Sequence, residues 1–113
     1  MNTEFMTADT NLPPCLPLPG VMLGLPVSST AKVMYAKLLG AVLTAGVEDA
    51  NGILFIRFRL AELAVALGRS TQTCKRALRE LETAGLILRV RQGIGAPNRI
   101  YVLIPGKEGA ALA

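Results

Sequence analysis

The order of hydrophobic patterns along the chain predicts an α+β fold of three helices and a small antiparallel sheet. In three segments apolar residues recur at three- and four-residue spacing, which is typical of helices with one buried face. In three shorter segments β-branched and aromatic residues dominate, or apolar residues alternate with polar ones, as in strands. A stretch containing Gly and Pro separates the last two strands, which indicates a hairpin.

The chain has 113 residues, of which 51% are hydrophobic, so it is long enough for one domain with one modest core. We expect this domain to span residues 28–104. Residues 1–27 form a leader whose five prolines forbid a continuous helix, although its leucines are too apolar for a solvated linker. We therefore expect the leader to lie across its own domain or across a second subunit. Residues 105–113 form a tail of mostly small residues.

The first helix is expected to begin after Ser28 or Ser29, since either side chain can cap its N-terminus, and to end at Gly46. A turn over residues 49–52 follows, and residues 53–58 are rich in the residue types of a strand. The apolar residues that repeat along the first helix are Ala31, Met34, Tyr35, Leu38, Val42 and Ala45.

Two further helices are predicted close together. The second spans residues 60–67, and the third begins after Ser70 and ends before Gly85. The three residues 68–70 between them have the length of a helix-turn-helix connection. The residues that we expect on the buried side of the third helix are Cys74, Ala77, Leu78 and Leu81.

Strands at residues 86–91 and 99–104 alternate apolar and polar residues, and residues 92–98 join them as a hairpin tip. A helix-turn-helix followed by such a hairpin is the order of a winged-helix domain, in which the third helix is the recognition helix and the hairpin is the wing.

Charge is distributed unevenly. Residues 1–52 hold two basic and four acidic residues, a net charge of −2, whereas residues 53–113 hold ten basic and four acidic residues, a net charge of +6. A basic surface attracts polyanions, although it also serves simply to keep a protein soluble. The positive half is the one that contains the predicted recognition helix and wing.

The composition argues against an enzyme and against a metal site. There is no His, which excludes nucleophile–His pairs and His-ligated metals, and no two acidic residues stand out as an acid–base pair. Two cysteines are too few for a zinc site. We expect Cys74 to be a small core residue and both thiols to be free, with a disulfide to Cys15 as the alternative. No membrane span and no secretory signal is expected, so we expect a cytoplasmic protein without cofactors.

The outer side of the third helix carries Gln72, Arg76, Arg79 and Thr83, with Thr73 and Lys75 on its flanks. Gln and Arg are the types that pair bidentately with adenine and guanine, and a helix N-terminus such as that at Ser70 and Thr71 suits a phosphate. An ordinary amphipathic surface helix is the alternative interpretation.

Three arginines flank the hairpin tip. Arg89 and Arg91 share one face of their strand, and antiparallel pairing is expected to bring Arg99 close to them. A basic hairpin beside a recognition helix is well placed to touch the DNA backbone or minor groove, whereas the alternative is a solvated ribbon.

Three segments together resemble the N-terminal domain family of plasmid replication initiator protein A, which is common on plasmids of Gram-positive bacteria. They are SSTAKVMYAKLL (28–39), GILFIRFRLAELAVALGRSTQTCKRALRELETAGLI (52–87) and RVRQGIGAPNRIYV (89–102). The resemblance implies a winged helix that binds repeated sites in a plasmid origin, often as a dimer, and that helps to open the duplex or to load host replication proteins. The chain departs from the family pattern at Ala96, where a basic residue is usual, and full-length members carry a further C-terminal domain.

The function that we expect is sequence-specific binding of double-stranded DNA, as the origin-binding domain of a replication initiator and as a homodimer. A winged-helix transcriptional regulator is one alternative. A winged-helix protein-interaction module in replication or partition complexes is another. The candidate DNA-binding residues are Ser70, Thr71, Gln72, Thr73, Lys75, Arg76, Arg79, Arg89, Arg91, Asn98 and Arg99.

Overall fold

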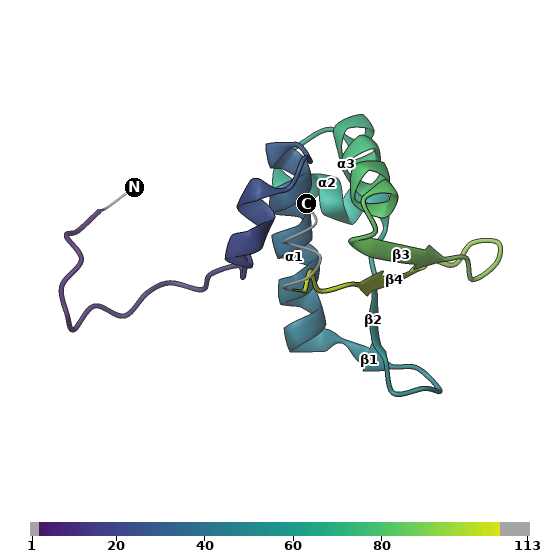
Figure 1. Cartoon of the computed structure of the whole chain (residues 1–113), viewed down its shortest axis with the longest axis horizontal. Helices are drawn as coiled ribbons and strands as arrows, with labels where there is room; N and C mark the ends of the chain where they lie inside the picture. The colour runs from purple at the N-terminus through teal and green to yellow at the C-terminus, as the bar shows by residue number, and fades with distance from the viewer. Residues whose placement is uncertain (1–2, 107–113) are drawn as a thin grey trace.

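The computed structural model describes residues 3–106 and confirms the α+β fold of three helices with a small sheet. The sheet has the strand order β1-β2-β4-β3, and every neighbouring pair is antiparallel. The helices lie together on one side of the molecule, and the loop between β3 and β4 projects away from them (Figure 1). The elements in chain order are the 3-10 helix η1 (Gly20–Gly24), α1 (Ser29–Ala45), β1 (Val47–Glu48), β2 (Leu54–Arg57), α2 (Leu60–Leu67), α3 (Thr71–Thr83), β3 (Ile87–Val90) and β4 (Arg99–Val102).

Helix α1 begins and ends close to the predicted residues. The Ser28 Oγ accepts a hydrogen bond from the Ala31 amide at 3.1 Å, which satisfies one of the free amides of the first turn. Gly46 ends the helix in an extended conformation, with φ −64° and ψ 142°, and not in the left-handed one that Gly usually adopts at a helix end. A Cβ on Gly46 would lie 2.5 Å from the Val42 carbonyl oxygen in the last turn of the helix, so only Gly fits at this position.

The strand β1 was not predicted. Val47 and Glu48 pair with Phe55 and Leu54 of β2, and β2 itself is shorter than the predicted residues 53–58. The Asp49 carboxylate closes the turn between them, because its Oδ1 accepts hydrogen bonds from the Asn51 amide at 2.8 Å and the Ile53 amide at 3.0 Å. A two-residue strand is too short to show a period of two in the sequence.

The helix-turn-helix is confirmed. Arg59 has no capping side chain, but its amide donates to Glu62 Oε1 at 2.8 Å, and α2 begins at the next residue. Gly68 adopts the left-handed conformation, with φ 63°, and turns the chain toward α3. There the Ser70 Oγ accepts from the Thr73 amide at 3.1 Å and caps the helix.

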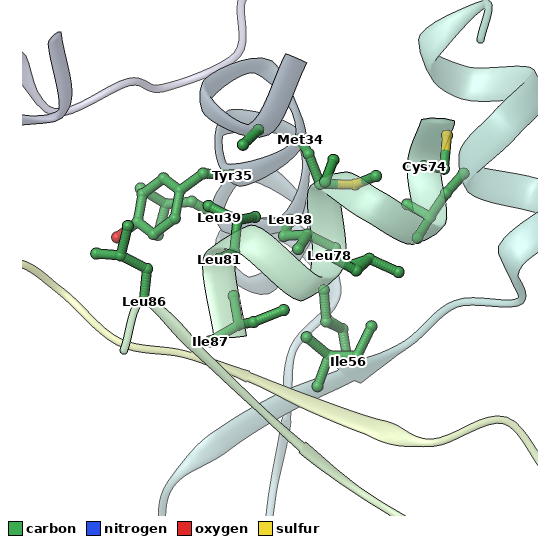
Figure 2. Packing of buried hydrophobic residues seen from close by; sticks show 14 of the residues in the cluster. Met34, Tyr35, Leu38, Leu39, Ile56, Cys74, Leu78, Leu81, Leu86 and Ile87 are labelled. Carbon is green, nitrogen blue, oxygen red and sulfur yellow. The ribbon is translucent and has the colours of Figure 1, made fainter. Parts of the chain in front are cut away.

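The core lies between α1, α3 and the inner face of the sheet (Figure 2). Each fully buried large apolar side chain stabilises the fold by about 1.5–3 kcal/mol relative to exposure. The Tyr35 ring is buried in this core, and its hydroxyl donates to the Leu103 carbonyl at 2.8 Å. Burial raises the pKa of Tyr35 above its usual value. The largest fully buried side chains are those of Tyr35, Met22, Met34, Leu38, Leu63, Leu81 and Cys74.

The leader is only partly attached to the domain. Met22 of η1 is fully buried in the core, and the leader crosses α1 so closely that a Cβ on Gly40 would lie 3.2 Å from the Pro17 side chain. Before that point the chain extends away from the domain (Figure 1), and Phe5 and Met6 are 95% and 74% exposed. The expectation that the leader lies across its own domain therefore holds from the crossing onward. Of the predicted tail, residues 107–113 lie outside the described residues.

Candidate nucleic-acid interface

Helix α3 separates an apolar side from a polar side, as the sequence predicted. Cys74, Ala77, Leu78 and Leu81 are buried in the core. The four side chains expected on the opposite side are exposed, and none of them belongs to the hydrophobic core. They therefore leave α3 free to present hydrogen-bonding groups outward, which is what a helix in a DNA major groove must do. These four residues are Gln72, Arg76, Arg79 and Thr83.

One flank of this polar side is bordered by the leader. Pro26 and Val27 face Arg76 and Arg79 across a groove of about 570 Å³. Two hydrogen bonds fix the residue that follows the leader, since Glu80 Oε1 accepts from the Ser28 amide at 2.9 Å and Glu80 Oε2 accepts from the Ser28 hydroxyl at 2.6 Å. These hydrogen bonds, chiefly the one from the hydroxyl, lower the pKa of Glu80 below its usual value.

The other flank is bordered by the wing. A second groove, of about 420 Å³, separates α3 from the β3–β4 loop and reaches the start of α2. Three basic side chains line this groove. They are Arg59 just before α2, Lys75 on α3 and Arg89 on β3. Asn98 of the wing lines it as well. A basic groove between a recognition helix and a wing has the charge and shape to hold one strand of a phosphate backbone.

Arg59 was not among the residues that the sequence predicted to bind DNA. It is exposed and lines the groove beside Lys75. The available signal was a basic residue directly before a helix N-terminus in a helix-turn-helix, where a phosphate is favoured by the helix dipole.

Arg89 is held by an ion pair. Its Nη2 lies 2.8 Å from Glu82 Oε1 on α3, and its Nε donates to Glu82 Oε2 at 3.3 Å. The two hydrogen bonds from Arg89, followed by its charge, lower the pKa of Glu82. The pair ties the base of the wing to the end of α3, and it neutralises part of the charge that Arg89 would offer to DNA.

The expected grouping of three arginines at the wing base is wrong. Arg99 pairs directly with Val90, whereas Arg89 pairs with Ile100. Directly opposed residues of an antiparallel pair share a face, and alternate residues of a strand point to opposite faces. Arg99 therefore lies on the outer face of the sheet, away from Arg89 and α3. The register between β3 and β4 decides which face Arg99 occupies, and the alternation of residues within one strand does not reveal that register.

The remaining candidates lie at the N-terminus of α3 and in the wing. Ser70 and Thr71 are exposed, and the hydroxyls of Ser70 and half-buried Thr73 are 2.9 Å apart. Arg91, together with Asn98, borders a hollow at the wing tip. The structure thus places ten of the eleven candidates on α3, on its N-cap, in the groove between α3 and the wing or at the wing tip, with Arg99 as the exception.

Within residues 3–106 no helix is long and apolar enough to cross a membrane. The same part of the chain contains no group of three or more metal-ligating side chains. Cys74 is buried, as expected, whereas Cys15 is exposed on the leader, and both are free thiols.

A helix-turn-helix, here α2 and α3, that is followed by a basic hairpin defines a winged-helix domain. Residues 25–104 match the family model described as the N-terminus of replication initiator protein A (RepA). This segment contains every element from α1 to β4, and the chain belongs to this family. None of the curated proteins compared matches the chain.

Solved structures share the fold at low sequence identity. One, described as the N-terminal domain of a DNA-binding protein, is 18% identical and has a TM-score of 0.74 over 98% of this chain and 92% of that one. An MDR initiator structure is 22% identical, with a TM-score of 0.71 over 96% and 93%. A Rep–DNA complex is 19% identical, with a TM-score of 0.67 over 90% and 85%.

Proposed function

We propose that this chain binds double-stranded DNA at specific sites and acts as the origin-binding domain of a replication initiator. The observation that carries the proposal is the exposed polar side of α3, which presents Gln72, Arg76 and Arg79 beside a groove lined by three basic residues. Family membership and the fold shared with a Rep–DNA complex support it. No catalysis is involved, because recognition requires only contacts.

In this proposal α3 enters the major groove. Gln72 and Arg76 hydrogen-bond to base edges, since their amide and guanidinium groups match adenine and guanine. Arg59 and Lys75 contact phosphates of the DNA strand that lies in the groove between α3 and the wing. Arg91 and Asn98 contact the phosphate backbone of the DNA further along. Base contacts supply the sequence preference, while the phosphate contacts supply most of the salt dependence.

The test begins with selection of a preferred duplex from a random library, followed by fluorescence anisotropy on that duplex and on a scrambled one across a salt series. We expect the selected duplex to bind more tightly, and the logarithm of the affinity to fall by about 0.9 per phosphate contact for each tenfold rise in salt. Binding to neither duplex at low salt would contradict the proposal and favour a protein partner.

We further propose that the domain works as a homodimer in the cytoplasm and that host replication proteins join it at the origin. The homodimer is supported by the extended leader, whose Phe5, Met6 and Leu12 are 95%, 74% and 63% exposed. Apolar side chains that are mostly exposed on their own domain gain stability by packing on a second copy. Two copies related by a twofold axis would read half-sites about one helical turn apart.

A further inference from the structure

Five side chains form a connected cluster on the outer face of the sheet, opposite to α3. Phe55 is only 6% exposed although it lies on this face, because other side chains cover its ring. The Arg99 and Arg57 guanidinium carbons lie 4.4 and 5.3 Å from the centre of the ring, and the Tyr101 ring lies 5.7 Å from it. The fifth member is Gln92, the second residue of the wing loop after β3.

Gln92 joins the two arginines. Its Oε1 accepts hydrogen bonds from Arg99 Nε at 3.0 Å and from Arg57 Nη2 at 3.1 Å. The two arginines are direct cross-strand partners, and like charges at such positions repel each other. The shared amide oxygen and the face of the Phe55 ring provide the attraction that keeps both guanidinium groups in place.

The cluster is fixed at its far end as well. Arg99 Nη1 donates to the Tyr101 hydroxyl at 3.4 Å, and the Tyr101 hydroxyl donates to Asp49 Oδ2 at 2.9 Å. The Asp49 carboxylate in turn accepts from two backbone amides of the β1–β2 turn. A continuous path of contacts therefore runs from that turn, across β2 and β4, to Gln92 near the start of the wing loop.

We propose that Gln92 is a positioning residue, which sets the direction of the wing loop by anchoring the start of the loop to Arg57 and Arg99, and that Arg99 serves this anchor and does not contact DNA. The proposal rests on the DNA-binding function proposed above. Together with the Arg89–Glu82 ion pair on the inner face, the anchor holds the wing base from both sides of the sheet. Arg91, the neighbour of Gln92, is exposed and remains available to phosphates.

The test compares Gln92→Met, which keeps the length of the side chain but removes the acceptor, with Gln92→Glu, which keeps an acceptor. The first readout is nuclear magnetic resonance of the free protein. We expect Gln92→Met to shift the Arg99 Nε–H signal and to lower the order parameters of the amides of residues 93–96. Gln92→Glu should retain the hydrogen-bonded Nε–H signal and the order of the loop. Unchanged signals in Gln92→Met would overturn the anchor.

The second readout is DNA binding by the full chain, with Arg91→Gln as the matched control. We expect Gln92→Met to lower affinity about three- to tenfold at low salt and to reduce the salt slope by about one, with the base preference intact. Arg91→Gln should reduce the slope similarly but leave the loop order unchanged. A changed loop with unchanged binding in Gln92→Met would overturn the role in DNA recognition. Failure of the wild type to bind would remove the proposed function and this role with it, while the spectra would still decide whether the anchor exists.

Discussion

At the scale of single residues, the interface divides into side chains that are free to move and side chains that are already engaged. Arg76 and Arg79 are exposed on α3. Arg89 is bound to Glu82, and Arg99 is bound to Gln92. A free guanidinium can adopt the bidentate geometry that a guanine requires, whereas an engaged one must first give up its partner. We therefore assign base recognition to the free residues.

We predict that Arg76→Ala weakens binding to the preferred duplex by about 1–3 kcal/mol and relaxes the preference at one base position. The matched control is Arg76→Lys, which keeps the charge but loses the planar, bidentate donor group, so that it should retain part of the affinity and lose the preference. Anisotropy on duplexes that differ at single positions checks both. An equal loss on every duplex would show that Arg76 contacts only phosphate.

Glu82 places a negative charge at the wing side of α3 and occupies Arg89. We predict that Glu82→Gln raises affinity for any duplex and increases the salt slope by about one, because one more guanidinium becomes available to phosphates. The loss of a half-exposed ion pair should cost less than about 1 kcal/mol of unfolding free energy. Salt titrations with Glu82→Gln and with Glu82→Gln/Arg89→Ala measure this, and an equal slope for the two would contradict it.

At the scale of elements, the link between the start of α1 and α3 depends on one carboxylate. Ser28 caps α1 and also donates two hydrogen bonds to Glu80 of α3. Loss of the cap alone in Ser28→Ala should cost about 0.5–2 kcal/mol. Because the leader joins the domain at this point, the same contacts also position Pro26 and Val27 beside the recognition face.

The lowered pKa of Glu80 gives this link a pH dependence. A carboxyl group whose pKa is lower in the folded state stabilises the fold above its unfolded pKa, near 4.5, and the contribution is lost as the pH falls through the folded value. We predict that stability decreases below about pH 4.5 less steeply in Glu80→Gln than in the wild type, by less than about 1 kcal/mol because the group is near the surface. Urea unfolding at pH 7 and pH 3.5 measures the difference. Equal decreases in the two proteins would rule out this contribution.

The elements also show which features a sequence can predict. Sequence predicts the three helices and the two sides of α3, because the apolar residues within each of these segments repeat about every 3.6 residues. The face of Arg99 and the strand β1 were not, since both depend on pairing with residues far along the chain. The 3-10 helix η1 was hidden by the surrounding prolines. The Arg89–Glu82 contact forms only when the turn after α3 folds the two elements together.

At the scale of the whole molecule, the first part of the leader does not pack against the core of the domain. Among the described residues, Met22 is the first that belongs to the core, and residues 3–12 extend away from the body of the domain (Figure 1). A segment that buries little of its own surface adds little to the stability of its own domain. Its apolar side chains are available for a second copy.

We predict that deletion of residues 1–12 leaves the melting temperature of the domain unchanged within about 2 °C but weakens self-association at least tenfold. Sedimentation equilibrium and thermal unfolding at low protein concentration separate the two effects. A matched variant, Phe5→Ser/Met6→Ser, should reproduce the weaker association without shortening the chain. A dimer that is equally stable after the deletion would place the interface elsewhere.

The separation of the two sides of α3 has a consequence for how such initiators diversify. Gln72, Arg76, Arg79 and Thr83 belong to the same helix as four core residues, yet none of them packs in the core. If these residues read the DNA sequence, as proposed above, substitutions at these positions change the preferred sequence with little cost in stability. Two initiators with this fold could then acquire different preferred DNA sequences through a few mutations, and each could act in the same cell without binding the DNA sites of the other. Mutations on the buried side would instead damage folding before they altered the choice of target.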